Sequence, residues 1–223
     1  MKKKDFIIPF KYEDRRPIII NGLLYIPDNY FLHSQADIEI LFNNTNPIFL
    51  EYCSGNGEWI IEKAKKFINI NWIAVEYSFD RARKIFVKKH NENIENLFIV
   101  FGEALIFTKC YLKDSFIDHV FINFPDPWPK TKHKKNRLVQ NPFVIEVFRV
   151  LKENSFIEIA TDHEKYKDQI VLEFLSTNYF RSFYKKPFFI NELEEYGSSY
   201  FEKLYKKMNK QINYMKFKKI VSG

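Results

Sequence analysis

The feature that most constrains the fold is an alternation of short apolar stretches with segments of helical spacing, which begins near residue 48. The apolar stretches are rich in Ile, Val, Leu and Phe, which is typical of buried strands. Strands are expected at 48–52, 72–76, 97–101, 117–124 and 156–161, and helices at 58–67, 79–91, 142–151 and from the fifth strand to about 176. Strands that alternate with helices pair in parallel through right-handed crossovers. The chain is therefore predicted to be an α/β protein with a mostly parallel sheet.

The two ends of the chain show a weaker pattern. Residues 1–45 are expected to form a partly irregular N-terminal extension, with a helix as one reading of 29–43. Near the other end we expect a strand close to 180–185, a helix at about 199–209 and a final strand over 212–218. Because 223 residues is an ordinary length for one domain, residues 46–223 are predicted to form a single domain.

Acidic residues stand at the carboxyl ends of the expected strands: Glu51, Glu76, Glu103, Asp126 and Asp162. In open α/β sheets, ligands bind in the crevice outside those ends. One acid alone is more often a solvated strand terminus. Three at successive strand ends favour a nucleoside pocket, in which Glu76 would accept the ribose hydroxyls and Glu103 would lie near an adenine edge.

A loop with two glycines joins the first strand to the first helix. Gly55 and Gly57 would let the backbone approach a ligand closely. The loop lacks the third glycine of a dinucleotide fingerprint, since position 60 is Ile60, and this disfavours an NAD enzyme. Acids on both sides of the loop, Glu51 and Glu58, suit a ligand that carries positive charge, such as S-adenosylmethionine with its sulfonium and ammonium groups.

A proline-rich turn follows the fourth strand. Pro125, Pro127 and Pro129 stop regular structure there and hold Asp126 and Trp128 in a stiff segment. The next eight residues, 130–137, contain five Lys or Arg, one His and no acid. A solvated charge run after a plain proline-rich loop is the simplest reading. The alternative is a rigid carboxylate and an aromatic ring presented at a cationic surface, which would suit chemistry on a polyanion.

The segment Phe124-Pro125-Asp126-Pro127-Trp128, with Arg137-Leu138-Val139 after the basic run, resembles the signature of the tRNA (guanine-N7)-methyltransferase family. The resemblance covers about residues 48–218. It implies a Rossmann-like class I methyltransferase fold, a mostly parallel central sheet flanked by helices with an antiparallel C-terminal strand. It also implies S-adenosylmethionine as cofactor, and methyl transfer to N7 of a guanosine in the tRNA variable loop, position 46 in tRNA convention.

The resemblance also assigns roles to residues of this chain. Cofactor contacts are expected at Glu51, Glu76, Glu103 and Asp126, together with the loop glycines Gly55 and Gly57. Substrate contacts are expected at Lys130, Asp162, Ser199 and Glu202, and RNA phosphate contacts at Lys132, His133, Lys134, Lys135 and Arg137. Thr161–Glu164 and Ser199–Glu202 both read as capping boxes too, so each is also a plain helix start. The chain departs from the family at Cys53, where Gly is usual, and at Glu103, where Asp is usual.

The chemistry of guanine N7 explains why so few catalytic groups are needed. N7 has a free lone pair and loses no proton when it is methylated, so no strong general base is required. Alignment and electrostatics supply most of the catalysis. Asp126 is the expected catalytic residue, because its carboxylate would hydrogen-bond guanine N–H groups and offset the positive charge that develops on the ring. Trp128 is expected to pack under the turn or to stack on the base.

Two other functions remain open from the sequence. Methylation of an exocyclic amine in a nucleic acid favours an Asn/Asp-Pro-Pro-aromatic turn, whereas Asp126 here separates the prolines. An RNA-binding subunit without catalysis would not need the acids at the strand ends, and cofactor binding distinguishes it from an enzyme.

Composition adds weaker expectations. The net charge of +7 is compatible with tRNA as partner. Cys53 and Cys110 give neither a metal-ligand spacing nor a disulfide framework, so no metal and a cytoplasmic location are expected. The uncharged run from Pro17 to Pro27 is too short to span a bilayer, and no membrane association is predicted. The choice between monomer and homodimer is left open.

Overall fold

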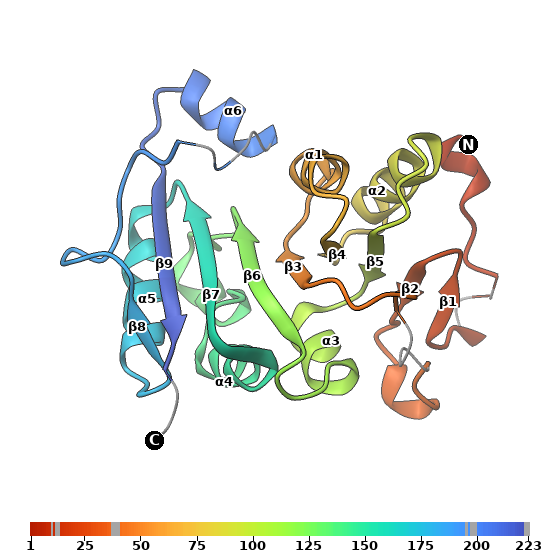
Figure 1. Ribbon diagram of the computed structural model, residues 1–223, viewed down its shortest axis with the longest axis horizontal. Coiled ribbons are helices and arrows are strands. Elements are labelled where there is room, and N and C mark those ends of the chain that lie inside the picture. The colour runs from red at the N-terminus through yellow and green to blue at the C-terminus, as the bar shows by residue number, and fades with distance from the viewer. Residues whose placement is uncertain (10, 12–13, 37–40, 195, 197–199, 221–223) are drawn as a thin grey trace. The chain divides into compact units, whose positions relative to one another are not determined.

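The computed structural model describes the chain except for residues 10, 12–13, 37–40, 195, 197–199 and 221–223 (Figure 1). It divides into two compact units, Met1–Tyr111 and Leu112–Gly223. Each unit contains its own group of strands and helices.

The first unit contains five strands in the order β1-β2-β5-β4-β3. The strands are β1 Ile18–Ile20, β2 Leu23–Tyr25, β3 Ile48–Tyr52, β4 Asn71–Glu76 and β5 Leu97–Phe101. Its helices are α1 Glu58–Lys66, α2 Phe79–Asn91 and α3 Ala104–Tyr111, with short 3-10 helices η1 Lys3–Asp5 and η3 Tyr30–Leu32. All neighbouring strands are parallel except β1, which is antiparallel to β2.

The core of this unit forms where helix and strand side chains meet. Ala82, Ile85 and Phe86 are buried on α2, with the spacing that places them on one helix face. Trp72 of β4 lies edge-on to Trp59 of α1, with ring centroids 5.8 Å apart. Apolar burial of this kind is what holds the short helices against the sheet.

The N-terminal segment contains a β-hairpin that the sequence reading did not anticipate. Asn21 and Gly22 join β1 to β2 with positive φ angles of 48° and 79°, as expected for an Asn-Gly hairpin turn. β2 pairs in parallel with β5, so the hairpin extends the sheet. The helix considered for 29–43 is not present in the described part of that range, which holds the 3-10 helix Tyr30–Leu32, and residues 37–40 lie outside the described part.

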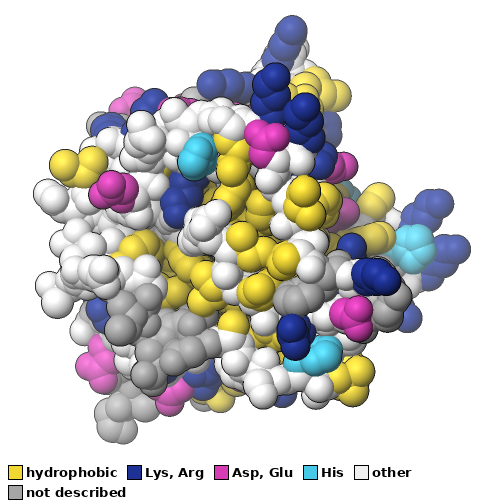
Figure 2. Space-filling view, turned by 90° about the vertical axis from the view of Figure 1, so that its right-hand side faces the viewer, with side chains coloured by type: hydrophobic (Ala, Val, Ile, Leu, Met, Phe, Trp, Pro, Cys, Tyr) yellow, Lys and Arg dark blue, Asp and Glu magenta, His cyan; other side chains and the backbone are white. Residues whose placement is uncertain are grey.

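Figure 2 shows the face of the molecule on the side of β1 and β2. Hydrophobic side chains gather in the middle of this face, with lysine and arginine side chains around them (Figure 2). The exposed apolar residues of the N-terminal segment include Ile7, Phe31 and Leu32.

The second unit contains four strands in the order β6-β7-β9-β8. The strands are β6 Ile117–Asn123, β7 Leu151–Thr161, β8 Phe180–Ser182 and β9 Asn213–Lys219. The helices are η4 Thr131–Asn136 (3-10), α4 Asn141–Val150, α5 Glu164–Leu175 and α6 Tyr200–Lys207. β6 and β7 are parallel, whereas β9 is antiparallel to both β7 and β8. Helix α5 packs on this sheet through Phe174, whose ring stacks on Phe217 of β9 at 4.6 Å.

The expectation of a mostly parallel sheet flanked by helices, with an antiparallel C-terminal strand, is confirmed. Helix α3 was not expected, and β7 begins at Leu151 rather than at 156. The boundary between an N-terminal extension and a single domain at residues 45 and 46 stays a prediction. Within the described residues, no helix combines the length and apolarity needed to cross a bilayer.

Candidate functional site

The glycine loop of the first unit connects β3 to α1 through three residues with left-handed backbone. Cys53, Gly55 and Gly57 have φ angles of 61°, 57° and 80°. A Cβ added at Gly57 would stand 2.7 Å from Cγ1 of Ile85 on α2, so glycine is required there for space as well as for conformation. Cys53 adopts its left-handed conformation with a side chain, which costs about 1–2 kcal/mol. Cys53, at a position where the family usually has Gly, therefore adds local backbone strain to the loop.

Glu76 at the end of β4 fixes this loop. Its Oε2 accepts the Gly55 N–H at 2.8 Å, and its Oε1 accepts the Ser78 N–H at 2.8 Å. The side chain is 5% exposed, and burial raises its pKa although these two bonds and Arg81 act in the opposite direction. The Tyr77 N–H also acts on this carboxylate. A carboxylate offers about four lone-pair positions, so Glu76 keeps some capacity to accept a further hydrogen bond.

Glu51 and Glu103 stand at the ends of the strands on either side of Glu76. Glu51 is 1% exposed on β3, and its carbonyl accepts the Ser54 hydroxyl at 3.2 Å. Glu103 lies at the surface just after β5, where partial desolvation and then the charge of Asp28 raise its pKa. Because β3, β4 and β5 are parallel neighbours, the three acids lie along one edge of the sheet, as the sequence predicted.

Two lysines of α2 donate hydrogen bonds to the glycine loop at Asn56. Lys84 Nζ donates to the side-chain oxygen of Asn56 at 2.8 Å. Lys88 Nζ donates to the Asn56 carbonyl at 2.8 Å and to Glu58 at 3.0 Å. Sequence reasoning missed both residues, because nothing in a helical charge pattern shows which lysine reaches a loop 28 or more positions away.

The proline turn of the second unit follows β6. Phe124 and Trp128 have positive φ angles of 49° and 39°. Asp126 is exposed, and its Oδ1 accepts the Trp128 N–H at 3.1 Å. Within the described residues, the second carboxylate oxygen of Asp126 has no hydrogen-bond donor. Trp128 is half-buried and lies edge-on to His133, at 5.8 Å between ring centroids, so it packs on the segment that follows the turn.

Asp162, at the end of β7, belongs to the same part of the second unit. It forms an ion pair with Lys210 at 2.7 Å, and Lys210 Nζ lies 4.4 Å from the centre of the Tyr205 ring. Burial raises the pKa of Tyr205, and the charges of Asp162 and Asp126 raise it further while Lys210 opposes them. The charges of both carboxylates therefore act on the pKa of the same hydroxyl group, that of Tyr205.

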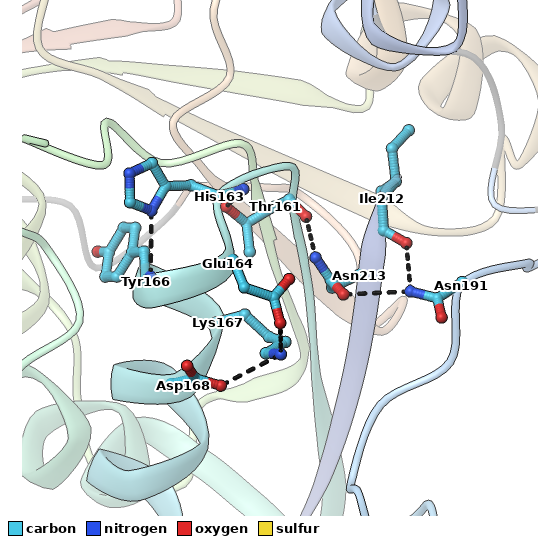
Figure 3. Close-up of polar contacts among 9 residues, drawn as sticks. All are labelled: Thr161, His163, Glu164, Tyr166, Lys167, Asp168, Asn191, Ile212 and Asn213. Atoms are coloured by element: carbon cyan, nitrogen blue, oxygen red, sulfur yellow. Dashed lines mark hydrogen bonds and ion pairs between the residues drawn. The ribbon is translucent and has the colours of Figure 1, made fainter. Parts of the chain in front are cut away.

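Figure 3 shows hydrogen bonds of Thr161 and His163, the residues on either side of Asp162 in the sequence. The Thr161 carbonyl accepts Asn213 Nδ2 at 3.3 Å, and Asn191 Nδ2 donates to Asn213 at 3.1 Å and to the Ile212 carbonyl at 3.1 Å. Helix α5 is capped by His163, whose Nδ1 accepts the Tyr166 N–H at 3.2 Å. The capping box predicted over Thr161–Glu164 is therefore wrong, because His163 is the capping residue and Glu164 instead pairs with Lys167.

Glu202 and Ser199 were predicted to contact substrate from the start of the last helix. Glu202 is 3% exposed, and its Oε1 accepts Lys206 Nζ at 2.6 Å and the Tyr214 hydroxyl at 3.0 Å. Burial and Glu202 raise the pKa of Tyr214. Ser199 lies outside the described residues.

The basic run divides into surface residues and one buried residue. Lys130, Lys132, Lys134 and Lys135 are exposed, and His133 is half-buried. Arg137 is only 3% exposed, and its Nε donates to the Pro127 carbonyl at 2.7 Å. The described partners of the guanidinium are thus internal ones, which does not favour the expected phosphate contact of Arg137.

Among the residues that the structure describes, no cluster of three or more His, Cys, Asp or Glu side chains is arranged to hold an ion. Neither Cys53 nor Cys110 forms a disulfide in the described part of the chain.

A glycine loop after β3, with acids at the ends of three neighbouring parallel strands, is typical of an open α/β sheet that binds a ligand at the carboxyl edge of its strands. The fold is similar to that of a SAM-dependent methyltransferase from Aquifex aeolicus, with a TM-score of 0.53 at 14% identity over 80% of this chain and 85% of that one. An rRNA methylase from Streptococcus thermophilus has a TM-score of 0.52 at 13% identity, over 79% of this chain and 88% of that one.

Sequence comparison narrows the class. A family model described as a methyltransferase matches residues 45–215. The chain is 42% identical to a tRNA (guanine-N(7)-)-methyltransferase of Chlamydia abortus over 99% of both chains, and 39% identical to the enzyme of the same name from Chlamydia trachomatis over 95% of both. The chain belongs to the tRNA (guanine-N7)-methyltransferase family, and its cofactor is S-adenosylmethionine.

Proposed function

We propose that the chain methylates N7 of the guanosine at position 46 in the variable loop of tRNA. The observation that carries this proposal is the Asp126 turn. An exposed carboxylate with one uncommitted oxygen is followed at once by four exposed lysines, within a chain of this family. A carboxylate at a cationic surface suits a guanine base that is brought in on an RNA backbone.

The first unit would bind the cofactor. The bound S-adenosylmethionine supplies a methyl group on a sulfonium, which is already activated for transfer. Gly55 and Gly57 leave this part of the loop without side chains. Glu76 would accept hydroxyl groups of the ribose, and Glu103 would meet the adenine edge. Glu51 supplies negative charge for a cationic ligand.

The second unit would bind the guanosine. The free oxygen of Asp126 would accept guanine N–H groups, which orients N7 and offsets the charge that develops on the ring. The cofactor contact expected of Asp126 stays a prediction. Asp162, which directly follows β7 in the same unit, is the second acid proposed to contact the substrate. Further proposed contacts are Lys130, Ser199 and Glu202.

The exposed part of the basic run would hold the RNA backbone. Lys132, Lys134 and Lys135 lie on the short 3-10 helix η4 with His133 among them, and Lys130 immediately precedes it. Lysine contacts of this kind supply affinity without reading sequence, and they make binding depend on salt. Choice of the guanosine would then rest on the shape of the tRNA and on the Asp126 turn.

The test is transfer of a labelled methyl group from S-adenosylmethionine to unmodified tRNA, followed by nucleoside analysis. We expect 7-methylguanosine that disappears when guanosine 46 is replaced. Methylation of another guanosine would refute the position, and a methylated exocyclic amine would refute the reaction. Binding of tRNA with no transfer would favour an RNA-binding subunit.

Two variants of Asp126 separate its charge from its role in the turn. Asp126→Asn keeps an acceptor for the Trp128 N–H, whereas Asp126→Ala removes it. We expect both to lower turnover by roughly 100-fold, which is typical when an electrostatic contact in the transition state is lost. Cofactor affinity measured by calorimetry shows whether the loss lies in binding. Full turnover in Asp126→Asn would refute the role of the charge.

A further inference from the structure

Arg137 is a buried cation beneath the proline turn. Its Nε donates to the Pro127 carbonyl at 2.7 Å, and its guanidinium carbon lies 4.8 Å from the centre of the Tyr166 ring. Its Nη1 donates to Oε1 of Gln169 at 2.6 Å. Arginine stays charged in proteins, and a buried charge is stable only when its donors are satisfied.

The partners of Arg137 come from the turn and from α5, and none of those found in the described residues is an acid. A carbonyl, an amide oxygen and an aromatic face replace a counterion. The planar guanidinium matches this arrangement, because its fork of donors reaches two acceptors while its face covers a ring. A lysine ammonium in the same place could not make these contacts together.

The same helix holds the chain beyond the basic run. The Tyr166 hydroxyl accepts the Val139 N–H at 3.0 Å, and Gln169 Nε2 donates to the Val139 carbonyl at 3.1 Å. Tyr166 lies near the beginning of α5 (Figure 3). Both ends of the segment from Pro127 to Val139 are therefore fastened to one rigid helix, while the lysines between them remain at the surface.

We propose that Arg137 is a positioning residue, which fastens the Asp126 turn to α5 through Pro127, Tyr166 and Gln169. Asp126 immediately precedes the residue whose carbonyl Arg137 holds. A small displacement of a catalytic group lowers a rate strongly, since orientation is a large part of catalysis. This inference rests on the proposed function of Asp126.

The main test compares Arg137→Lys with Lys134→Gln on unmodified tRNA. For Arg137→Lys we expect turnover at saturating substrates to fall by roughly 10- to 100-fold. The dissociation constants for cofactor and tRNA should change by less than about threefold, and the slope of log affinity against log salt should stay the same, because no phosphate contact is lost. Lys134→Gln should instead reduce that slope by about one.

Arg149→Lys is the matched control. Arg149 also lies in the second unit and binds a carbonyl, that of Leu112, at 2.8 Å, and it forms ion pairs with Asp114 and Glu146. We expect Arg149→Lys to leave turnover unchanged. Gln169→Met provides a second variant of the fastening should Arg137→Lys fold poorly, and it should lower turnover in the same direction by a smaller factor.

The rate of trypsin cleavage within residues 130–135 measures how firmly the segment is held on α5, and it does not depend on methyl transfer. Cleavage tracks the population of the locally opened segment, so Arg137→Lys should be cut there roughly tenfold faster than the unsubstituted protein or Arg149→Lys. Absence of methyl transfer by the unsubstituted protein would refute the proposed function. The cleavage rates would still show whether Arg137 holds the turn on α5. A reduced salt slope with full turnover, or unchanged turnover and cleavage, would overturn the inference.

Discussion

Replacement of Gly57 by alanine tests whether the glycine loop is held by close packing on α2. The added Cβ would stand 2.7 Å from Cγ1 and 3.3 Å from Cβ of Ile85, in a residue whose φ is 80°. Left-handed backbone costs a residue with a Cβ about 1–2 kcal/mol, and the enforced shift of a buried side chain adds about 1–3 kcal/mol. The lower entropy of alanine in the unfolded chain offsets roughly 0.5–1 kcal/mol of this.

We therefore expect Gly57→Ala to lower the free energy of unfolding by about 2–3 kcal/mol. Urea unfolding followed by circular dichroism measures this, and the midpoint should fall by about 1 M. Cofactor affinity measured by calorimetry should also fall, because the loop backbone must move. A loss below about 1 kcal/mol with unchanged affinity would refute the close-packing argument.

A double-mutant cycle separates the two contributions. Ile85→Ala removes Cγ1, the atom that the new Cβ would meet at 2.7 Å, together with Cγ2, but it leaves the φ of residue 57 unchanged. In that background the cost of Gly57→Ala should fall to about 1 kcal/mol, which gives a coupling of about 1–2 kcal/mol. Strictly additive effects would show that strain at residue 57, rather than contact with α2, carries the whole loss.

Two further predictions concern other parts of the protein. Lys88→Met should weaken S-adenosylmethionine binding several-fold in calorimetry while tRNA affinity stays constant, because Lys88 holds the Asn56 carbonyl of the loop; equal loss for both ligands would contradict this. Burial pushes the pKa of Glu158 upward, but hydrogen bonds from His119 and Lys216 lower it to about 2. A lowered folded pKa gives stability that is present above the unfolded value and is lost as pH falls toward 2. Glu158→Gln should therefore remove up to about 3 kcal/mol at pH 7 and flatten the unfolding free energy between about pH 4.5 and 2, whereas an unchanged slope would contradict it.

The sequence predicted most of the regular elements because their signals are local. The strands at 48–52 and 97–101 are confirmed to the residue. Their apolar runs are bounded by polar residues, which leaves little choice for where each strand begins and ends. The acids at their ends follow directly, because parallel neighbours bring their carboxyl ends to one edge.

The errors arose where a role depends on distant partners. Arg137 stands in a run of lysines and differs from them only by its burial against α5. Lys84 and Lys88 look like a solvated helix face but reach the glycine loop. The hairpin at Asn21 and Gly22 carries a recognisable turn signal, but its strands are only three residues long, and the prolines around it suggested irregular structure.

That hairpin also protects the sheet from association with other chains. Without it, β5 would present the unpaired backbone of Leu97–Phe101, an uncharged apolar strand of the kind that recruits further strands. β2 covers this row of donors and acceptors, and the new edge, β1, offers only three residues to a neighbour. The same segment packs Ile26 against Gly102, beside Glu103. Loss of the first 25 residues would therefore expose the edge of β5 to pairing with other chains. It would also loosen the adenine side of the proposed cofactor site.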